Sequence, residues 1–148
     1  RFLRLVCPVT CGCRSPTSGL MMNQAFDGCP RDVCRSSTEY VEALRKLPCK
    51  DVSAAELSKS AAWNSYFDQY EAFWSADFPD WTGLVRTFAQ NFRRYGCKAK
   101  DMDYFDDLCS EDSSFSSIRA FCPETCGCGP SDSRNCPLSC AASNASAV

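Results

Sequence analysis

Apolar residues recur at helical spacing through the central part of the chain, and the first such run predicts a short helix. A capping box, in which Ser36 is followed three residues later by Glu39, marks its start. Tyr40 and Leu44 lie on its apolar face. Pro48 closes it, because proline cannot continue a helix.

A second, longer helix is predicted to start at Asp51 or Ser53 and to end near Ala76. A second capping box favours a start at Ser53, because Glu56 follows it three residues later. The apolar stripe of this helix points Leu57, Trp63, Phe67, Tyr70 and Trp74 inward, with Tyr66 and Phe73 on its flanks.

A third helix follows a predicted turn at Phe78-Pro79-Asp80, and Asp80 or Thr82 is its expected cap. Gly96 is its predicted stop, because glycine readily adopts the left-handed conformation found after helices. The apolar stripe contains Leu84, Val85, Phe88, Phe92 and Tyr95.

Two further segments are predicted to be helical, residues 97–109 and the Ser-rich residues 110–121. Their apolar positions are Met102, Phe105 and Leu108 in the first and Phe115, Ile118 and Phe121 in the second. Strand signals are nearly absent from the sequence. The predicted fold class is therefore mainly α, a small helical domain with disulfide-rich, loop-dominated ends.

A chain of 148 residues can bury one moderate core, and its composition changes along its length. We predict four parts: a cysteine-rich N-terminal segment at 1–35, a helical and aromatic-rich middle at 36–96, a second cysteine-rich module at 97–140, and a flexible tail at 141–148.

The two ends of the chain share a repeated cysteine unit. The heptapeptide Cys122-Pro123-Glu124-Thr125-Cys126-Gly127-Cys128 matches Cys7-Pro8-Val9-Thr10-Cys11-Gly12-Cys13 at six of seven positions. A loop and a second cysteine pair follow each copy, Cys29-Pro30 to Cys34 and Cys136-Pro137 to Cys140. Three sulfurs this close cannot all pair locally without strain, so they are expected to reach other segments. We interpret the heptapeptide as a staple that ties a terminal segment to the helical body.

The cysteine content indicates structural disulfides in an oxidising compartment. The chain has thirteen cysteines and no histidine, and no pair of Cys-x-x-Cys motifs supports the alternatives of a zinc site or an iron-sulfur cluster. We therefore predict about six disulfides, one unpaired or intermolecular cysteine, and no metal or other cofactor. The framework consists of Cys7, Cys11, Cys13, Cys29, Cys34, Cys49, Cys97, Cys109, Cys122, Cys126, Cys128, Cys136 and Cys140.

Charge and residue types argue against several functional classes. The formal net charge is −2 with both signs scattered, which gives no electrostatic case for nucleic acid or an anionic membrane surface. No apolar run approaches the roughly 20 residues of a membrane helix. Without histidine the Ser-His and Cys-His nucleophiles are excluded, and we predict no enzyme. Thiol exchange at Cys11-Gly12-Cys13 or Cys126-Gly127-Cys128 is the remaining enzymatic alternative.

The run Ser-Ile-Arg-Ala-Phe-Cys-Pro-Glu-Thr-Cys-Gly at residues 117–127 resembles the C-terminal half of the ShKT module. This small cysteine-rich domain is named after a sea anemone potassium-channel toxin. Cys97 and Cys109 resemble the earlier cysteines of that family, and residues 5–13 look like the stub of a second module. Because the chain also starts with Arg1 rather than methionine, we expect a chain matured from a longer precursor.

Three features depart from the ShKT pattern. A single residue, Gly12 or Gly127, separates the last two cysteines where the family usually has two. One of the usual six cysteines has no counterpart, so the disulfide pairing of the family cannot be carried over. Residues 109–122 lack the Lys-Tyr pair that the toxins use to plug a channel, and Glu111 and Asp112 make this stretch acidic.

Tandem Cys-Pro-x-Thr-Cys-Gly-Cys segments joined by Ser/Gly loops also resemble cysteine-rich exported and plastid-targeted proteins of some algae with secondary plastids. This similarity implies the role of an extrinsic, disulfide-bonded accessory subunit on the lumenal side of a photosynthetic membrane complex.

A group of carboxylates is interpreted as the solvated face of the helix predicted at 97–109 and of the residues after it. Calcium binding is the alternative, but the Asp-x-Asp-x-Asp-Gly loop pattern is missing. The group consists of Asp101, Asp103, Asp106, Asp107, Glu111 and Asp112.

Eight aromatic residues fall within the 19 residues from Trp63 to Trp81, more than one helix face can bury. Most of them are expected in the core. Trp74, Phe78 and Trp81 are the candidates for an exposed patch that anchors a protein partner or contacts a pigment or lipid.

These observations predict a non-catalytic structural or binding protein, an extrinsic accessory subunit that braces a larger membrane assembly, in the thylakoid lumen or secreted. A secreted ShKT-like effector that binds a channel or receptor is the first alternative, and a thiol-disulfide oxidoreductase is the second. Asn144-Ala145-Ser146 fits the N-glycosylation pattern, and a glycan there would exclude a plastid lumen.

Overall fold

The computed structural model describes residues 12–20, 29–102, 105–111, 113, 115–130 and 134–142. Cys7, Cys11, Asp103, Asp112 and Asn144, which figure in the sequence-based predictions, lie outside the described residues. Helices, connected by turns and by longer irregular segments, are the regular elements of the described part, which confirms the mainly α fold class. The elements are α2 (Arg31–Arg35), α3 (Thr38–Lys46), α4 (Ala54–Leu57), α5 (Ala61–Asp77), η1 (Pro79–Trp81), α6 (Thr82–Tyr95), η2 (Gly96–Asp101) and α7 (Ser139–Ala142).

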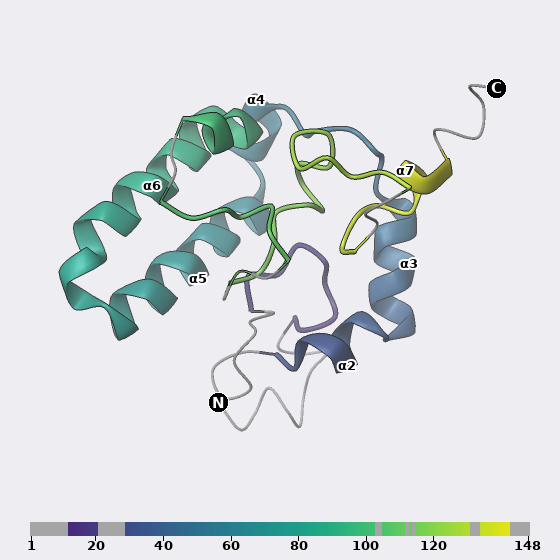
Figure 1. Ribbon diagram of the computed structural model, residues 1–148, viewed down its shortest axis with the longest axis horizontal. Coiled ribbons are helices and arrows are strands. Elements are labelled where there is room, and N and C mark those ends of the chain that lie inside the picture. Colours follow the sequence, from purple (N-terminus) through teal and green to yellow (C-terminus); the bar gives the residue numbers. More distant parts are fainter. Residues whose placement is uncertain are drawn as a thin grey trace.

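The helices α5 and α6 form an antiparallel hairpin on one side of the molecule, and α2 and α3 lie on the other side (Figure 1). Aromatic rings hold the hairpin together: Phe67 stacks on Phe92 at 5.3 Å between centroids, and Tyr70 on Phe88 at 5.4 Å. Outside this contact, Arg93 on α6 pairs with Asp68 and Glu71 on α5.

The first predicted helix forms as α3, but its cap is Ser37 rather than Ser36. The Ser37 side chain accepts a hydrogen bond from the Tyr40 backbone N–H, whereas the Ser36 hydroxyl donates to the Val33 carbonyl at the end of α2. The sequence pattern did not reveal that α2 lies directly before this helix and uses Ser36 as its C-cap.

The second predicted helix is divided into α4 and α5. Ser53 and Glu56 form the predicted capping box, but α4 ends after four residues. Ser60 then caps α5 by accepting from the Trp63 backbone N–H. The Asn64 side chain donates to the carbonyls of Ser58 and Ser60, which stabilises the break between the two helices.

The third predicted helix forms as α6, with two differences. It begins at Thr82 without a side-chain cap, and neither Asp80 nor Thr82 fills that role. Leu84 is 52 % exposed, and Ala89 takes its place in the buried stripe with Val85, Phe88 and Phe92. These four positions follow the i, i+3, i+4, i+7 spacing of a single helix face, which Leu84 does not share. Gly96 ends α6 at a positive φ of 61°, as predicted.

The helices predicted at 97–109 and 110–121 are wrong for the described residues. Among the described residues from 97 to 121, the one helical element is η2, a short 3-10 helix that ends at Asp101, and Met102 is 56 % exposed. The backbone groups of this segment make other hydrogen bonds than those of a helix. The Ile118 N–H donates to the Leu108 carbonyl. The carbonyls of Glu111 and Phe115 accept from the guanidinium of Arg31, about 80 residues earlier in the chain. Four of the six apolar positions in these two stretches are nevertheless buried, namely Leu108, Phe115, Ile118 and Phe121.

Two clusters of buried residues support the fold. The main core joins α4, α5, α6 and η2 to the segment from Leu108 to Cys122, and Trp63 and Tyr66 are among its largest fully buried side chains. A smaller cluster contains Cys13, Cys29, Cys34, Tyr40 and Leu44. Because residues on both sides of position 96 share the main core, the middle and the C-terminal module pack as one body there. The four-part division of the chain stays a prediction.

Five disulfides link ten of the eleven described cysteines: Cys13–Cys29, Cys49–Cys140, Cys97–Cys122, Cys109–Cys126 and Cys128–Cys136. This number agrees with an oxidising, extracytoplasmic compartment. Cys34 is a free thiol. In the part of the chain that the structure describes, no helix has both the length and the apolarity to cross a membrane.

Candidate functional site

Four aromatic rings gather where α5 turns into α6, and we call this group the aromatic tip: Trp74, Phe78, Trp81 and Phe105. Phe78 and Trp81 stack with 4.6 Å between centroids and 15° between planes. Trp74 lies against both, at 5.6 Å from Phe78 and 6.3 Å from Trp81. Phe105 meets the edge of this stack, at 5.9 Å from Trp81.

Local sequence places the tip. Trp74 belongs to the last turn of α5, and Phe78 is the C-cap of that helix. Pro79 then starts η1, which is suited to proline because its fixed φ matches the first helical positions. Phe78 and Trp81 therefore sit at a short turn that begins with proline, between two helices that pack together, and Phe105 reaches them from the segment after η2.

The tip is anchored at one side and exposed at the other. Trp74 is half-buried and contacts Tyr70 and Phe73, which belong to the main core. Phe78 is 42 % exposed and Trp81 is 44 % exposed, and Leu84 follows on the first turn of α6. Large apolar side chains so exposed and so close together are typical of interaction surfaces.

Carboxylates flank the exposed rings. Asp77 ends α5 and Asp80 lies in η1, both exposed, and neither the last turn of α5 nor η1 carries a basic residue. This surface is apolar with an acidic edge, which favours a partner with an apolar groove and basic groups around it. Partner binding at Trp74, Phe78 and Trp81 stays a prediction.

Most of the aromatic cluster lies in the core, as expected. Trp63, Tyr66, Phe67, Tyr70 and Phe73 are all buried. Tyr66 and Phe73, predicted on the flanks of the stripe, are covered by Phe115, at 5.3 Å and 5.7 Å between centroids. This covering comes from a segment about 50 residues away in sequence, which a helical pattern cannot reveal.

The acidic group does not form the predicted helix face. Glu111 is buried and pairs with Arg35 at 2.5 Å. Asp106 accepts hydrogen bonds from the Tyr70 hydroxyl at 3.0 Å and from Ser113 at 3.5 Å. Burial raises the pKa of the Asp106 carboxyl above its usual range, and these hydrogen bonds oppose the shift. Among described residues, the one close group of three potential metal ligands is Cys13, Cys29 and Cys34.

The C-terminal heptapeptide is fastened to the segment before α4. The Asp51 carboxylate accepts from the backbone N–H groups of Glu124 and Thr125 and from the Thr125 hydroxyl at 2.5 Å. In return, the Glu124 carboxylate accepts from the Asp51 N–H at 2.9 Å. Two disulfides add to these contacts, Cys97–Cys122 and Cys109–Cys126. Together they tie the C-terminal heptapeptide to the helical body, as the staple interpretation predicts.

The two repeat units share their described geometry. Gly12 and Gly127 both have positive φ, at 74° and 68°. The final cysteine of each heptapeptide bonds to the first cysteine of the pair that follows, as Cys13–Cys29 and Cys128–Cys136. In each pair the second cysteine lies on a short helix: Cys34 lies on α2, and Cys140 lies on α7.

Cys126 and Cys128 are each bonded to another cysteine rather than to each other. In this disulfide state the pair does not present the adjacent dithiol that the oxidoreductase alternative requires. In the N-terminal copy, Cys13 is likewise bonded to a distant cysteine, Cys29, and Cys11 lies outside the described residues.

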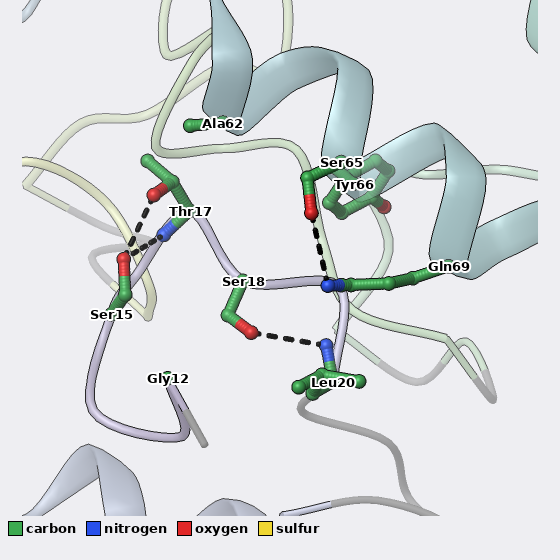
Figure 2. Close-up of a pocket in the computed structure, with 9 residues that line it drawn as sticks. All are labelled: Gly12, Ser15, Thr17, Ser18, Leu20, Ala62, Ser65, Tyr66 and Gln69. Carbon is green, nitrogen blue, oxygen red and sulfur yellow. Dashed lines mark hydrogen bonds between the residues drawn. The ribbon is translucent and has the colours of Figure 1, made fainter. Parts of the chain in front are cut away.

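A small cavity of about 190 Å³ lies between the loop at 12–20 and α5 (Figure 2). Its polar groups largely bond to one another: the hydroxyls of Ser15 and Thr17 lie 2.8 Å apart, and the Gln69 amide donates to the Ser65 hydroxyl at 3.2 Å. Among the described residues no charged side chain lines it, and it is smaller than the roughly 300 Å³ at which ligand pockets begin. We therefore place the candidate site at the aromatic tip.

Comparison with protein-family models gave no match, and searches of curated proteins and of solved structures also gave none. The structure by itself defines the class of the protein. It is a small helical domain stabilised by at least five disulfides.

Proposed function

We propose that this chain is a non-catalytic binding protein that docks its aromatic tip into an apolar groove of another protein. The observation that carries the proposal is the stacked pair Phe78 and Trp81, each more than 40 % exposed, at the end of a rigid helical hairpin. Aromatic side chains of this kind dominate binding energies because they bury large areas at low entropic cost.

The disulfide framework supports the same role. A binding surface loses affinity when it must be ordered on binding, and pre-organisation reduces that cost. Here Phe105 braces the tip from a segment whose following cysteine, Cys109, is bonded to Cys126. The scaffold thus favours a tip that is already in its binding geometry.

The finer proposal is an extrinsic accessory subunit that braces a membrane assembly, such as the lumenal side of a photosynthetic complex. The resemblance of the repeated cysteine segments to plastid-targeted algal proteins supports this choice. A secreted ShKT-like effector that acts on a channel or receptor is the alternative, and a thiol-disulfide oxidoreductase is the second alternative. A direct contact with pigment or lipid at the tip is a separate outcome of the test below.

The test compares tip variants with a matched control during gentle native purification. Trp81→Ala and Phe78→Ala each remove one exposed ring, while Val33→Ala removes an exposed apolar side chain, 69 % exposed, from the distant helix α2. If the proposal is right, the wild-type chain and the Val33 variant co-migrate with a large complex. The tip variants should bind that complex at least tenfold more weakly, since a hot-spot ring contributes about 2 kcal/mol or more.

Three results would contradict the proposal or its finer form. Recovery of the wild-type chain as a free monomer from both membrane and soluble fractions would remove the accessory-subunit role. Equal binding by tip variants and the Val33 control would show that the contact lies elsewhere. Binding of the purified chain to protein-free lipid vesicles, lost in the Trp81 variant, would replace the protein partner with lipid.

A further inference from the structure

Three cysteine sulfurs meet in the smaller cluster, although only two of them form a bond. Cys13 and Cys29 are joined, and the free thiol of Cys34 completes a group whose sulfur atoms all lie within 4.8 Å of one another. Cys34 is therefore close to both sulfurs of the disulfide. Attack of a thiolate on a disulfide sulfur requires this kind of proximity.

Different segments bring the three sulfurs together. Cys13 belongs to the loop at 12–20, Cys29 precedes α2, and Cys34 lies in the last turn of α2. The Cys29 N–H donates to the Leu20 carbonyl at 2.7 Å, which holds the end of the loop beside the helix. Tyr40 and Leu44 of α3 cover the cluster.

The group is sealed from solvent. Cys13, Cys29 and Cys34 are 0 %, 1 % and 2 % exposed. A thiol in solution cannot reach this disulfide without local opening of the fold, whereas Cys34 is already inside. Among the described residues, Cys34 is the thiol placed to react with it.

The other repeat unit provides an internal comparison. Its equivalent disulfide is Cys128–Cys136, and the cysteine equivalent to Cys34 is Cys140. Cys140 is bonded to Cys49, 91 residues away in sequence, so that unit holds no thiol at this position. The two units share one geometry, but only the N-terminal one combines a disulfide with a neighbouring thiol.

We propose that Cys13, Cys29 and Cys34 form an intramolecular thiol-disulfide exchange site, in which Cys34 attacks the Cys13–Cys29 disulfide. The Cys34 thiolate forms a new S–S bond with either Cys29 or Cys13, and the bond between those two sulfurs breaks. The sulfur that leaves takes up the proton that Cys34 lost. One thiol and one disulfide are present before and after, so the step needs no external oxidant or reductant.

Exchange changes which segment is covalently held. A Cys29–Cys34 bond releases Cys13, so that among the described residues the loop at 12–20 is held by non-covalent contacts, including those with α5 (Figure 2). A Cys13–Cys34 bond keeps the loop attached and releases Cys29 instead. The site therefore controls how firmly this loop is tied to the helical body.

The rate of exchange should rise with pH, because only the thiolate reacts. Burial raises the pKa of the Cys34 thiol, and the positive charge of Arg14 opposes this shift. Arg14 itself is held by Glu39 on α3, at 2.6 Å.

The experiment locates the free thiol in the full chain. One sample is held at about pH 5 and another is incubated under native conditions at about pH 8.5, both at low protein concentration. Each is then unfolded at about pH 6 with excess maleimide, and tandem mass spectrometry of the digest identifies the labelled cysteines. We expect Cys34 to be labelled in the first sample, and label to appear on Cys13 or Cys29 in the second. Cys128 and Cys136 should stay unlabelled in both.

The variant Cys34→Ala should show no label on Cys13 or Cys29 after the same incubation. Label confined to Cys34 in the alkaline wild-type sample, with none on Cys13 or Cys29, would overturn the proposal. This result does not depend on how well the variant folds. Label that reaches Cys13 or Cys29 in the Cys34 variant would also overturn it, because another thiol would then be the nucleophile.

Discussion

At the scale of single residues, Asp106 shows how position changes the role of an acidic side chain. The sequence pattern assigned it to a solvated helix face, but the fold places it against the Tyr70 hydroxyl at 3.0 Å. Its carboxylate is partly removed from water, and burial raises its pKa above the usual value. The consequence is a pH dependence of stability that can be measured.

Asp106→Asn should remove this pH dependence while keeping an acceptor for Tyr70. Because the folded state raises the pKa, it binds the proton more tightly than the unfolded state does. The wild-type free energy of unfolding should therefore increase relative to that of the variant as pH falls from about 7 through the raised pKa towards the ordinary value of 3.8. Denaturant unfolding with disulfides intact, measured across this range, gives the comparison.

The matched control for this measurement is Asp101→Asn, because Asp101 is exposed at the end of η2. Its stability difference from wild type should vary less with pH. A constant difference between wild type and the Asp106 variant across the range would show that this carboxyl does not titrate as inferred.

At the scale of elements, the C-terminal heptapeptide owes its shape to hydrogen bonds as well as to disulfides. The turn closes on itself through the Cys128 N–H, which donates to the Pro123 carbonyl at 2.8 Å. Asp51 then satisfies the N–H groups of Glu124 and Thr125 from outside. The element therefore depends on a residue more than 70 positions earlier in the chain.

Asp51→Ala should destabilise the fold by about 1–3 kcal/mol, because it leaves these donors without a charged acceptor. Hydrogen exchange should become faster at the Glu124 and Thr125 amides, which places the effect in the heptapeptide. Asp101→Ala is the control for removal of a carboxylate and should change stability by no more than about 0.5 kcal/mol. Unchanged exchange at both amides in the Asp51 variant would show that the turn does not need this contact.

At the scale of the whole molecule, one buried arginine connects the two buried clusters. Arg31 begins α2, close to Cys29 and Cys34, and its guanidinium donates to the carbonyls of Glu111, Ser113 and Phe115. Phe115 belongs to the main core. Arg35, one turn later, pairs with Glu111 and strengthens the same connection.

Arg31→Met should destabilise the protein by about 3 kcal/mol or more, because it leaves buried carbonyl groups without their charged donor. Arg45→Met is the matched control: Arg45 is exposed and pairs only along its own helix, so its loss should cost less than about 1 kcal/mol. Denaturant unfolding of both variants with intact disulfides measures the difference. Equal stability of the two variants would contradict the structural role given to Arg31.

The sequence by itself determined the helical body. Capping residues, apolar spacing and the stop at Gly96 act within a few positions, so the pattern located α3 and α6 to within a few residues. It also located the stretch of α4 and α5, although it predicted one helix there instead of two. It also singled out Trp74, Phe78 and Trp81, because an aromatic excess around a proline turn can be counted without a structure. The repeat of the cysteine unit was visible as well, and its described geometry is shared by both copies.

Only the tertiary structure decided the conformation of residues 97–121 and the disulfide partners, because both depend on contacts between distant parts of the chain. Apolar spacing in residues 97–121 matched a helix, but the segment is held by disulfides at Cys97 and Cys109 and by the Arg31 side chain, whose bonds replace those of a helix. Disulfide partners follow from closeness in space, so spacing could not identify Cys49–Cys140 or show that Cys34 lies unpaired beside Cys13–Cys29. Local hydrogen bonding fixes helices, whereas long-range packing fixes which sulfurs meet, and that is why the exchange site emerged only from the fold.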